Sequence, residues 1–182
     1  AAADKAVAAA PEEPDAWAAR AEAKRRLNDL EGALADFDRA LALAPGEPRF
    51  LGGRAELKRR LGDWAGAEAD APGWAQRAEA RRCGGRPKEA LEAADRAVAE
   101  ERSAWTLVVR AKALRALGRN AEAERSLADA LTLEPGSYLA RSWRGEALRA
   151  LGRGTEALAE LDQALRAEPS CAWARVLRGA LK

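Results

Sequence analysis

The pattern of apolar and polar positions along this chain repeats every 34 residues. Stretches that start at Pro14, Ala104 and Tyr138 align with one another without gaps. Each period holds two helix-length segments, with small residues at the places where two helices must approach closely. The pattern therefore predicts an array of helix pairs, and strands have little support.

Three positions of the period hold small side chains. A side chain larger than a methyl group there would force the two helices of a pair apart. The eighth position holds Ala21, Ala55, Ala78, Ala111, Gly145 and Gly179; the twentieth holds Ala33, Ala67, Ala90, Ala123 and Ala157; a third holds Ala6, Ala40, Ala97, Ala130 and Ala164. We expect these positions to form the helix contacts of each repeat.

Two further positions mark the helix ends. Residues that accept the left-handed conformation lie between the two helices of each repeat: Asn28, Gly62, Gly85, Gly118 and Gly152. Prolines then close the second helix, because proline cannot continue the hydrogen-bond ladder: Pro11, Pro45, Pro135 and Pro169.

Together these positions make the chain resemble the tetratricopeptide repeat family. The first repeat shows the family's series as Trp17, Ala21, Asn28, Ala33, Phe37, Ala40 and Pro45. The resemblance covers nearly all 182 residues and implies an all-α fold, a right-handed superhelical solenoid of antiparallel helix pairs. The chain departs from the family at the seventh position, where arginine replaces a large residue: Arg20, Arg77, Arg110, Arg144 and Arg178. We expect either a looser contact there or an arginine stem across the apolar seam with its charge in water.

We expect one continuous array. Its repeats are 14–47, 48–70, 71–103, 104–137 and 138–171, with the tail of a preceding repeat in 1–13 and the start of a further repeat or cap in 172–182. Both ends enter in the middle of the pattern, and the chain contains no methionine, so we expect a fragment of a longer solenoid.

The second repeat is shortened. Leu51 to Trp74 spans 23 residues where 34 are expected, so 11 are lacking from its second helix or the following turn. Either the second helix is stunted, or residues absent from the sequence separate Asp70 from Trp74. We favour absent residues, because Ala71-Pro72-Gly73 copies the helix-ending Ala44-Pro45-Gly46.

Composition argues against several functional classes. The net charge of +2 supplies no overall field for nucleic acid or an anionic membrane, although paired arginines such as Arg25 and Arg26 leave a basic stripe as an alternative. We see neither a membrane-spanning run nor a secretory signal, and we expect a cytoplasmic protein without nucleic-acid or membrane partners. There is no histidine, and Cys83 and Cys171 lie far apart, so we expect no metal, no cofactor and no catalytic residue.

For the family that the chain resembles, the expected function is binding of extended peptides or short helices in a concave groove lined by the first helices. Groove-facing residues fall at the second, fifth, ninth and twelfth positions. The ninth holds Glu22, Glu56, Glu79, Lys112 and Glu146, and the twelfth holds Arg25, Arg59, Arg82, Arg115 and Arg149. An acid followed three residues later by arginine is also an ordinary helix-surface pair, so most of this ladder is explained without a ligand.

The fourth repeat is the exception, because Lys112 replaces the acid and leaves Arg115 without a carboxylate in register. Apolar residues gather near it, and an apolar groove with a basic rim suits a peptide with hydrophobic anchors and an acidic group. The candidate partner-binding residues are Trp105, Val108, Val109, Lys112, Arg115, Leu139, Trp143, Arg149 and Trp173. Alternatively, the tryptophans simply pack between helices.

The sequence thus predicts a protein-interaction scaffold for a protein or peptide partner. The alternative is a regulatory or docking segment of a larger multidomain enzyme, in which the apolar C-terminal face covers another domain. Neither the partner nor the oligomeric state follows from the sequence.

Overall fold

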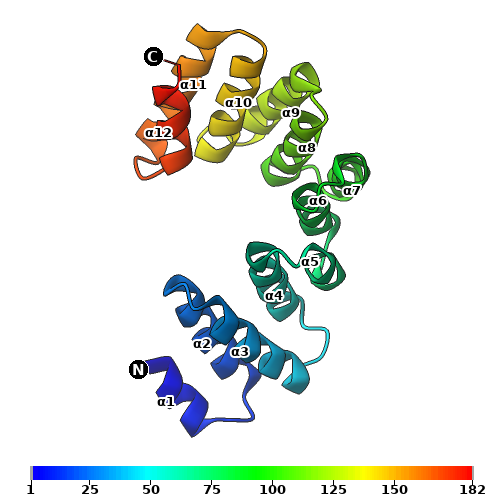
Figure 1. Cartoon of the computed structure of the whole chain (residues 1–182), viewed down its shortest axis with the longest axis vertical. Helices are drawn as coiled ribbons and strands as arrows, with labels where there is room; N and C mark the ends of the chain where they lie inside the picture. Colours follow the sequence, from blue (N-terminus) through cyan, green and yellow to red (C-terminus); the bar gives the residue numbers. More distant parts are fainter. Residues whose placement is uncertain (1, 182) are drawn as a thin grey trace. The chain divides into compact units, whose positions relative to one another are not determined.

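The computed structural model describes residues 2–181, and all regular secondary structure in that range is helical (Figure 1). The helices are α1 (Ala2–Ala9), α2 (Pro14–Arg26), α3 (Leu30–Leu43), α4 (Pro48–Leu61), α5 (Trp64–Asp70), α6 (Trp74–Cys83), α7 (Pro87–Glu100), α8 (Ala104–Ala116), α9 (Asn120–Leu133), α10 (Tyr138–Ala150), α11 (Gly154–Ala167) and α12 (Ala172–Gly179). The all-α class predicted from the sequence is confirmed.

The predicted helix ends are found where the pattern places them. The five residues expected in the left-handed conformation all have positive φ, from 64° at Asn28 to 85° at Gly62. Asn28 is the one residue other than glycine with positive φ in residues 2–181. The four closing prolines each follow the last residue of a second helix by two positions. Local backbone chemistry therefore sets the hairpins.

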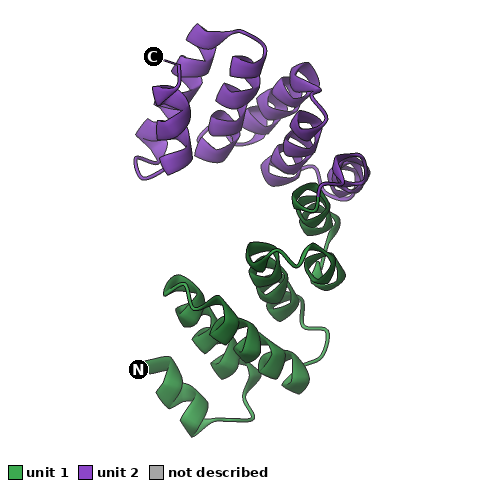
Figure 2. Ribbon diagram, in the orientation of Figure 1, with its two compact units in different colours: residues 1–84 green, residues 85–182 purple. Residues whose placement is uncertain are grey.

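The chain divides into two compact units, residues 1–84 and 85–182 (Figure 2). The boundary falls inside the repeat expected at 71–103, where we predicted one continuous array. In unit 1, the first helices α2 and α4 touch, as do α4 and α6. In unit 2, α10 touches both α8 and α12, whereas within residues 85–181 the second helix α9 touches neither α7 nor α11. Each unit therefore curves around its first helices, which we call its inner layer.

The small positions lie at the helix contacts. Every residue at the twentieth position is buried, and so are the eighth-position residues of the five repeats that have both helices. A Cβ atom added to Gly145 would lie 2.8 Å from Cγ of Leu161, which explains glycine in this repeat. Ala6 and Gly179 are exposed, because α1 and α12 each lack the other helix of their repeat in this chain.

The second repeat has a stunted second helix. α5 contains seven residues, and the bend at residues 71–73 leads directly into α6. In the chain as given, the structure has the stunted helix of the first explanation. The short helix is long enough to place Ala67 in the core and Asp70 against α4. Those two contacts preserve the hairpin.

Most seventh-position arginines hold ion pairs, which corrects both expectations from the sequence, while Arg77 lies 5.1 Å from the ring centre of Trp74. Arg20 donates two hydrogen bonds to Asp36, at 2.8 and 2.6 Å. Arg54, at the same position of the second repeat, donates two to Asp70, both at 2.7 Å. Arg144 donates to Glu160 at 2.7 Å. Each pair joins the two helices of one hairpin.

Several of these arginines also reach the second helix of the preceding repeat. Arg54 pairs with Asp38 at 2.7 Å, Arg110 with Asp95 at 2.6 Å, and Arg178 with Asp162 at 3.2 Å. The seventh position thus connects successive hairpins as well as the helices within one. The sequence reasoning missed these carboxylates, although they fall at regular positions of the period.

Asp36 and Asp70 are buried carboxylates with two cationic partners each. Burial raises the pKa of Asp36, but hydrogen bonds from Arg20 and Lys24 outweigh it and hold that pKa below its ordinary value. Asp70 is subject to the same opposing effects, and Arg54 and Lys58 lower its pKa. Because the folded-state pKa is depressed, the stabilisation is present above the unfolded-state value of about 3.9 and is lost as pH falls through the folded-state value.

We therefore expect the double substitution Asp36→Asn with Asp70→Asn to flatten the acid side of the stability profile. The unfolding free energy of the unaltered chain should fall more steeply below about pH 4 than that of the double variant. Urea titrations followed by circular dichroism from pH 6 down to pH 2.5 measure this. Asp129→Asn, on an exposed side chain of α9, is the control and should keep the original profile. Parallel profiles for the chain and the double variant would contradict the assignment.

Candidate functional site

The nine candidate residues lie on three neighbouring helices of unit 2. Five are on α8, three on α10 and one, Trp173, on α12. α10 packs against both of the other helices, so the structure brings the whole set to one inner layer.

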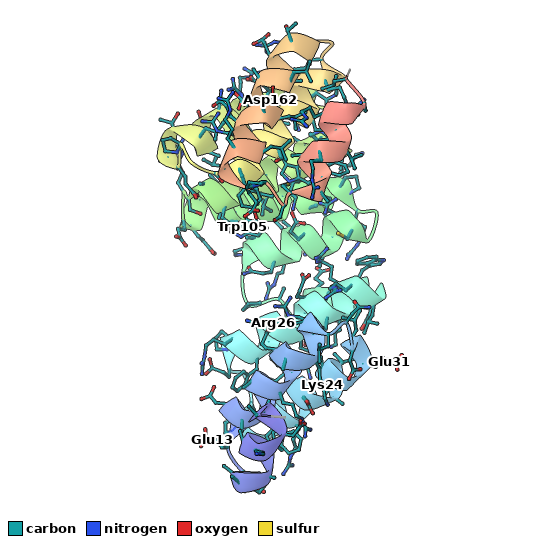
Figure 3. The ribbon with its side chains drawn as sticks, turned by 90° about the vertical axis from the view of Figure 1, so that its left-hand side faces the viewer. Glu13, Lys24, Arg26, Glu31, Trp105 and Asp162 are labelled. Carbon is teal, nitrogen blue, oxygen red and sulfur yellow. The ribbon has the colours of Figure 1, made fainter. Side chains whose placement is uncertain are left out.

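The apolar candidates differ in how deeply they are buried. Val108 and Val109 are each 1% exposed, so the expectation that they face a groove is wrong. Neighbouring first helices are in contact, and that contact covers side chains between them. Leu139 and Trp143 are half-buried and pack on the core of the unit. Trp105 and Trp173 are each 44% exposed; Trp105 is labelled in Figure 3.

The three tryptophans and Lys112 form a connected set, which we call the tryptophan row. The Lys112 ammonium lies 5.7 Å from the ring centre of Trp105 and 5.2 Å from that of Trp143. The rings of Trp143 and Trp173 are 6.0 Å apart with an interplanar angle of 39°. A cation over an indole face is attracted by the ring quadrupole, and tilted aromatic pairs are favourable at this spacing. The row therefore holds its aromatic faces in place across α8, α10 and α12.

The acid and arginine ladder behaves as predicted in three repeats. Glu22 pairs with Arg25 at 2.8 Å, Glu56 with Arg59 at 2.6 Å, and Glu79 with Arg82 at 3.1 Å. These are pairs within one helix between residues three apart, so they fit the ordinary surface explanation.

In unit 2 the pairing changes. Arg115 has no acid in register on its own helix, as expected, and it lies 2.6 Å from Glu146 of the next first helix. Its guanidinium also lies 5.6 Å from the ring centre of Trp143. Glu146 is buried, and its Oε2 atom and Nε of Arg115 have no hydrogen-bond partner in the described part of the chain. This pair is therefore less complete than the pair of Arg59 with Glu56, where Nε and Nη2 both donate.

Arg149 completes the candidate set. It is exposed near the end of α10, and no ion pair involving it occurs in residues 2–181. Its position in the repeat is that of Arg115, one first helix further along. The inner layer of unit 2 thus offers an exposed guanidinium beyond the tryptophan row.

The inner layer of unit 1 has different chemistry. Its second-position residues Asp15 and Arg49 pair with each other at 3.3 Å, where unit 2 has Trp105 and Trp173. They line a hollow of about 300 Å³ that also includes Phe37 and Phe50. Its rim charges are compensated, so unit 2 is the better candidate for ligand binding.

Residues 2–181 contain no group of three or more His, Cys, Asp or Glu side chains that could hold a metal ion. Within the same range, no helix is long and apolar enough to cross a bilayer.

Comparisons with known proteins agree on the type of repeat. Two family models described as tetratricopeptide repeat match residues 14–47 and 108–180. Among solved structures, a thermophilic protein of this family from Thermus thermophilus is 26% identical, covering 92% of this chain and 98% of its own, with a TM-score of 0.80. No curated protein matches significantly in sequence.

Two further solved structures resemble the fold and are described with a peptide. YrrB, described as having an unusual peptide-binding site, is 21% identical, covers 98% of both chains and has a TM-score of 0.59. The second such domain of human RPAP3, solved with an HSP70 peptide, is 20% identical, covering 74% of this chain and 98% of its own, with a TM-score of 0.55.

Proposed function

The chain belongs to the tetratricopeptide repeat family, and we propose that it is a protein-interaction scaffold that binds a segment of a partner protein on the inner layer of unit 2. The binding surface in this proposal is the tryptophan row, with Leu139, Arg115 and Arg149 beside it. Val108 and Val109 support the surface from the core and do not contact the ligand.

The observation that carries the proposal is the exposure of two tryptophans held in place by their neighbours. Trp105 and Trp173 are 44% exposed on the same inner layer, and each contacts another member of the row. A large side chain that keeps this much apolar surface in water, yet is already ordered, loses little conformational entropy when a ligand covers it. Tryptophan is for this reason among the residues that dominate binding energies.

Two of the similar solved structures support binding of a peptide. YrrB and the RPAP3 domain are both described with a peptide or a peptide-binding site. Within this chain, apolar side chains of a bound segment would lie against the indole faces of Trp105 and Trp173.

We expect Trp173→Ala to weaken peptide binding by about 30-fold, the effect of removing a binding hot spot. Because Trp173 is half-exposed on the terminal helix, the substitution should leave the fold intact. A peptide array probed with the whole chain identifies ligands, and fluorescence anisotropy with the best peptide measures the affinities.

Leu133→Ala is the matched control. Leu133 is 47% exposed but lies on α9, a second helix. Its substitution should change the affinity less than twofold. Equal effects of the two substitutions would place the ligand elsewhere than on the tryptophan row.

A further inference from the structure

One residue of the period changes how the charges pair on the inner layer of unit 2. In α2, α4 and α6, the ninth-position acid neutralises the arginine three residues later on its own helix. In α8 the ninth position is Lys112, so Arg115 has no acid at that place on its own helix. A like-charged neighbour at this spacing is unfavourable, and Arg115 must find its carboxylate elsewhere.

Arg115 takes the acid of the next first helix. Glu146, at the ninth position of α10, lies 2.6 Å from Arg115, and both side chains are largely buried. Glu146 therefore pairs with Arg115 and not with Arg149, although the pattern of the other repeats would pair it with Arg149. This accounts for the exposure of Arg149 and for the lack of an ion pair with it among the described residues. The single lysine at position 112 thus shifts the partner of Arg115 from its own helix to the first helix of the next repeat.

The result is an excess of basic over acidic side chains at two positions of the period in unit 2. At the ninth and twelfth positions, unit 2 has three basic side chains, Lys112, Arg115 and Arg149, and one acid, Glu146. The same positions of unit 1 hold three acids and three arginines. The chain as a whole is close to neutral, with a net charge of +2.

From this geometry we infer that Lys112 determines the charge specificity of the inner layer of unit 2, which selects a partner segment carrying acidic side chains among bulky apolar ones. The inference rests on the proposed function and adds the chemical class of the ligand. Lys112 is fixed between two indole faces, so its charge lies beside the surface that receives apolar side chains. Arg149 offers a planar guanidinium that can hold a carboxylate through two hydrogen bonds.

A peptide fits this surface better than a single-stranded nucleic acid. Nucleic-acid affinity depends on many phosphate contacts, each supplied by a basic side chain. Unit 2 has a net excess of only two positive charges at these positions, and Glu146 lies among them. An acidic segment with two or three carboxylates needs no more basic side chains than these.

The first test is structural. In Lys112→Glu the new carboxylate should pair with Arg115 on the same helix, release Glu146, and allow Glu146 to pair with Arg149. A crystal structure of the variant shows whether the pairing returns to the pattern of the other repeats. If Glu146 keeps its contact with Arg115 in the variant, Lys112 does not determine which acid pairs with Arg115, and the inference fails.

The second test measures binding by the whole chain. The peptide array carries each apolar pattern in three versions, with Glu, Gln or Lys at the remaining positions, and all peptides are N-acetylated and C-amidated. We expect hits mainly among the Glu peptides. For the best of these, Lys112→Glu should weaken binding at least tenfold, because it changes the surface charge by two and neutralises Arg149. Lys88→Glu makes the same charge change on α7, away from the inner layer, and should alter binding less than twofold.

The outcomes separate this inference from the proposed function. If Glu, Gln and Lys peptides bind equally and Trp173→Ala weakens all of them, the scaffold stands and the charge specificity is rejected. If no peptide binds, or if a twelve-residue oligothymidine binds more tightly than any peptide with a steep salt dependence, both are rejected. A Gln peptide with a free C-terminal carboxylate is also compared with the Glu peptide. If the two bind with equal affinity, the recognised charge is the C-terminal carboxylate and the inference is overturned.

Discussion

Replacing Leu127 by alanine is expected to lower the free energy of unfolding by about 3 kcal/mol. Leu127 is fully buried on α9, the second helix packed between α8 and α10. The loss includes the transfer of the removed methyl groups and the cavity that they leave. Here the cavity should persist, because nearby core residues such as Ala123 and Ala130 have side chains that are too short to fill it.

Urea unfolding followed by circular dichroism measures the loss, and Leu133→Ala is the control. Both leucines lie on α9, but Leu133 is nearly half exposed and its substitution should cost less than about 0.5 kcal/mol. Because stability in a repeat array is a sum over neighbouring contacts, the Leu127 substitution should mainly weaken unit 2. Similar losses for the two variants would mean that α9 does not pack as described.

The second large effect is expected for Asp70→Ala, which should destabilise the chain by about 2 to 3 kcal/mol. Asp70 is buried and accepts hydrogen bonds from Arg54, and Lys58 lies 2.7 Å from it. Removing one partner of a buried pair leaves the other with uncompensated charge. Arg54 and Lys58 remain about one-fifth exposed, so water offsets part of that cost and the effect falls below that of a fully buried pair.

Asp38→Ala provides the matched control for this prediction. Asp38 also pairs with Arg54 at 2.7 Å, but its side chain is more than half exposed. Its removal should cost less than about 1 kcal/mol. A double-mutant cycle with Arg54→Ala isolates the pairwise contribution of Asp70, and a coupling near zero would show that the stunted helix α5 is not held by this pair.

The fold could be predicted from the sequence because its determinants are local or strictly periodic. Asn28 and Gly62 end their helices through their own backbone preferences, and these do not depend on the rest of the chain. Ala33 and Ala123 mark close helix contacts, because only a small side chain fits there in any such hairpin. The period likewise placed the candidate site residues on successive first helices.

The burial of single site residues was harder to predict. Val108 occupies a nominal groove position, but it is buried in the core of unit 2. Trp105, at another groove position of the same helix, keeps nearly half of its surface. The period determines the face on which a residue lies, whereas its exposure depends on how closely the next helix approaches.

The sequence by itself determined the helices, the turns and the layer on which each repeated position lies, because these follow from residue preferences and spacing. The tertiary structure alone decided which charges meet between different helices. Arg115 has no acid at the ninth position of its own helix, and Glu146 reaches it only because α8 and α10 pack side by side. An ion pair between helices depends on distances of a few ångströms, which are set by packing and not by spacing along the chain.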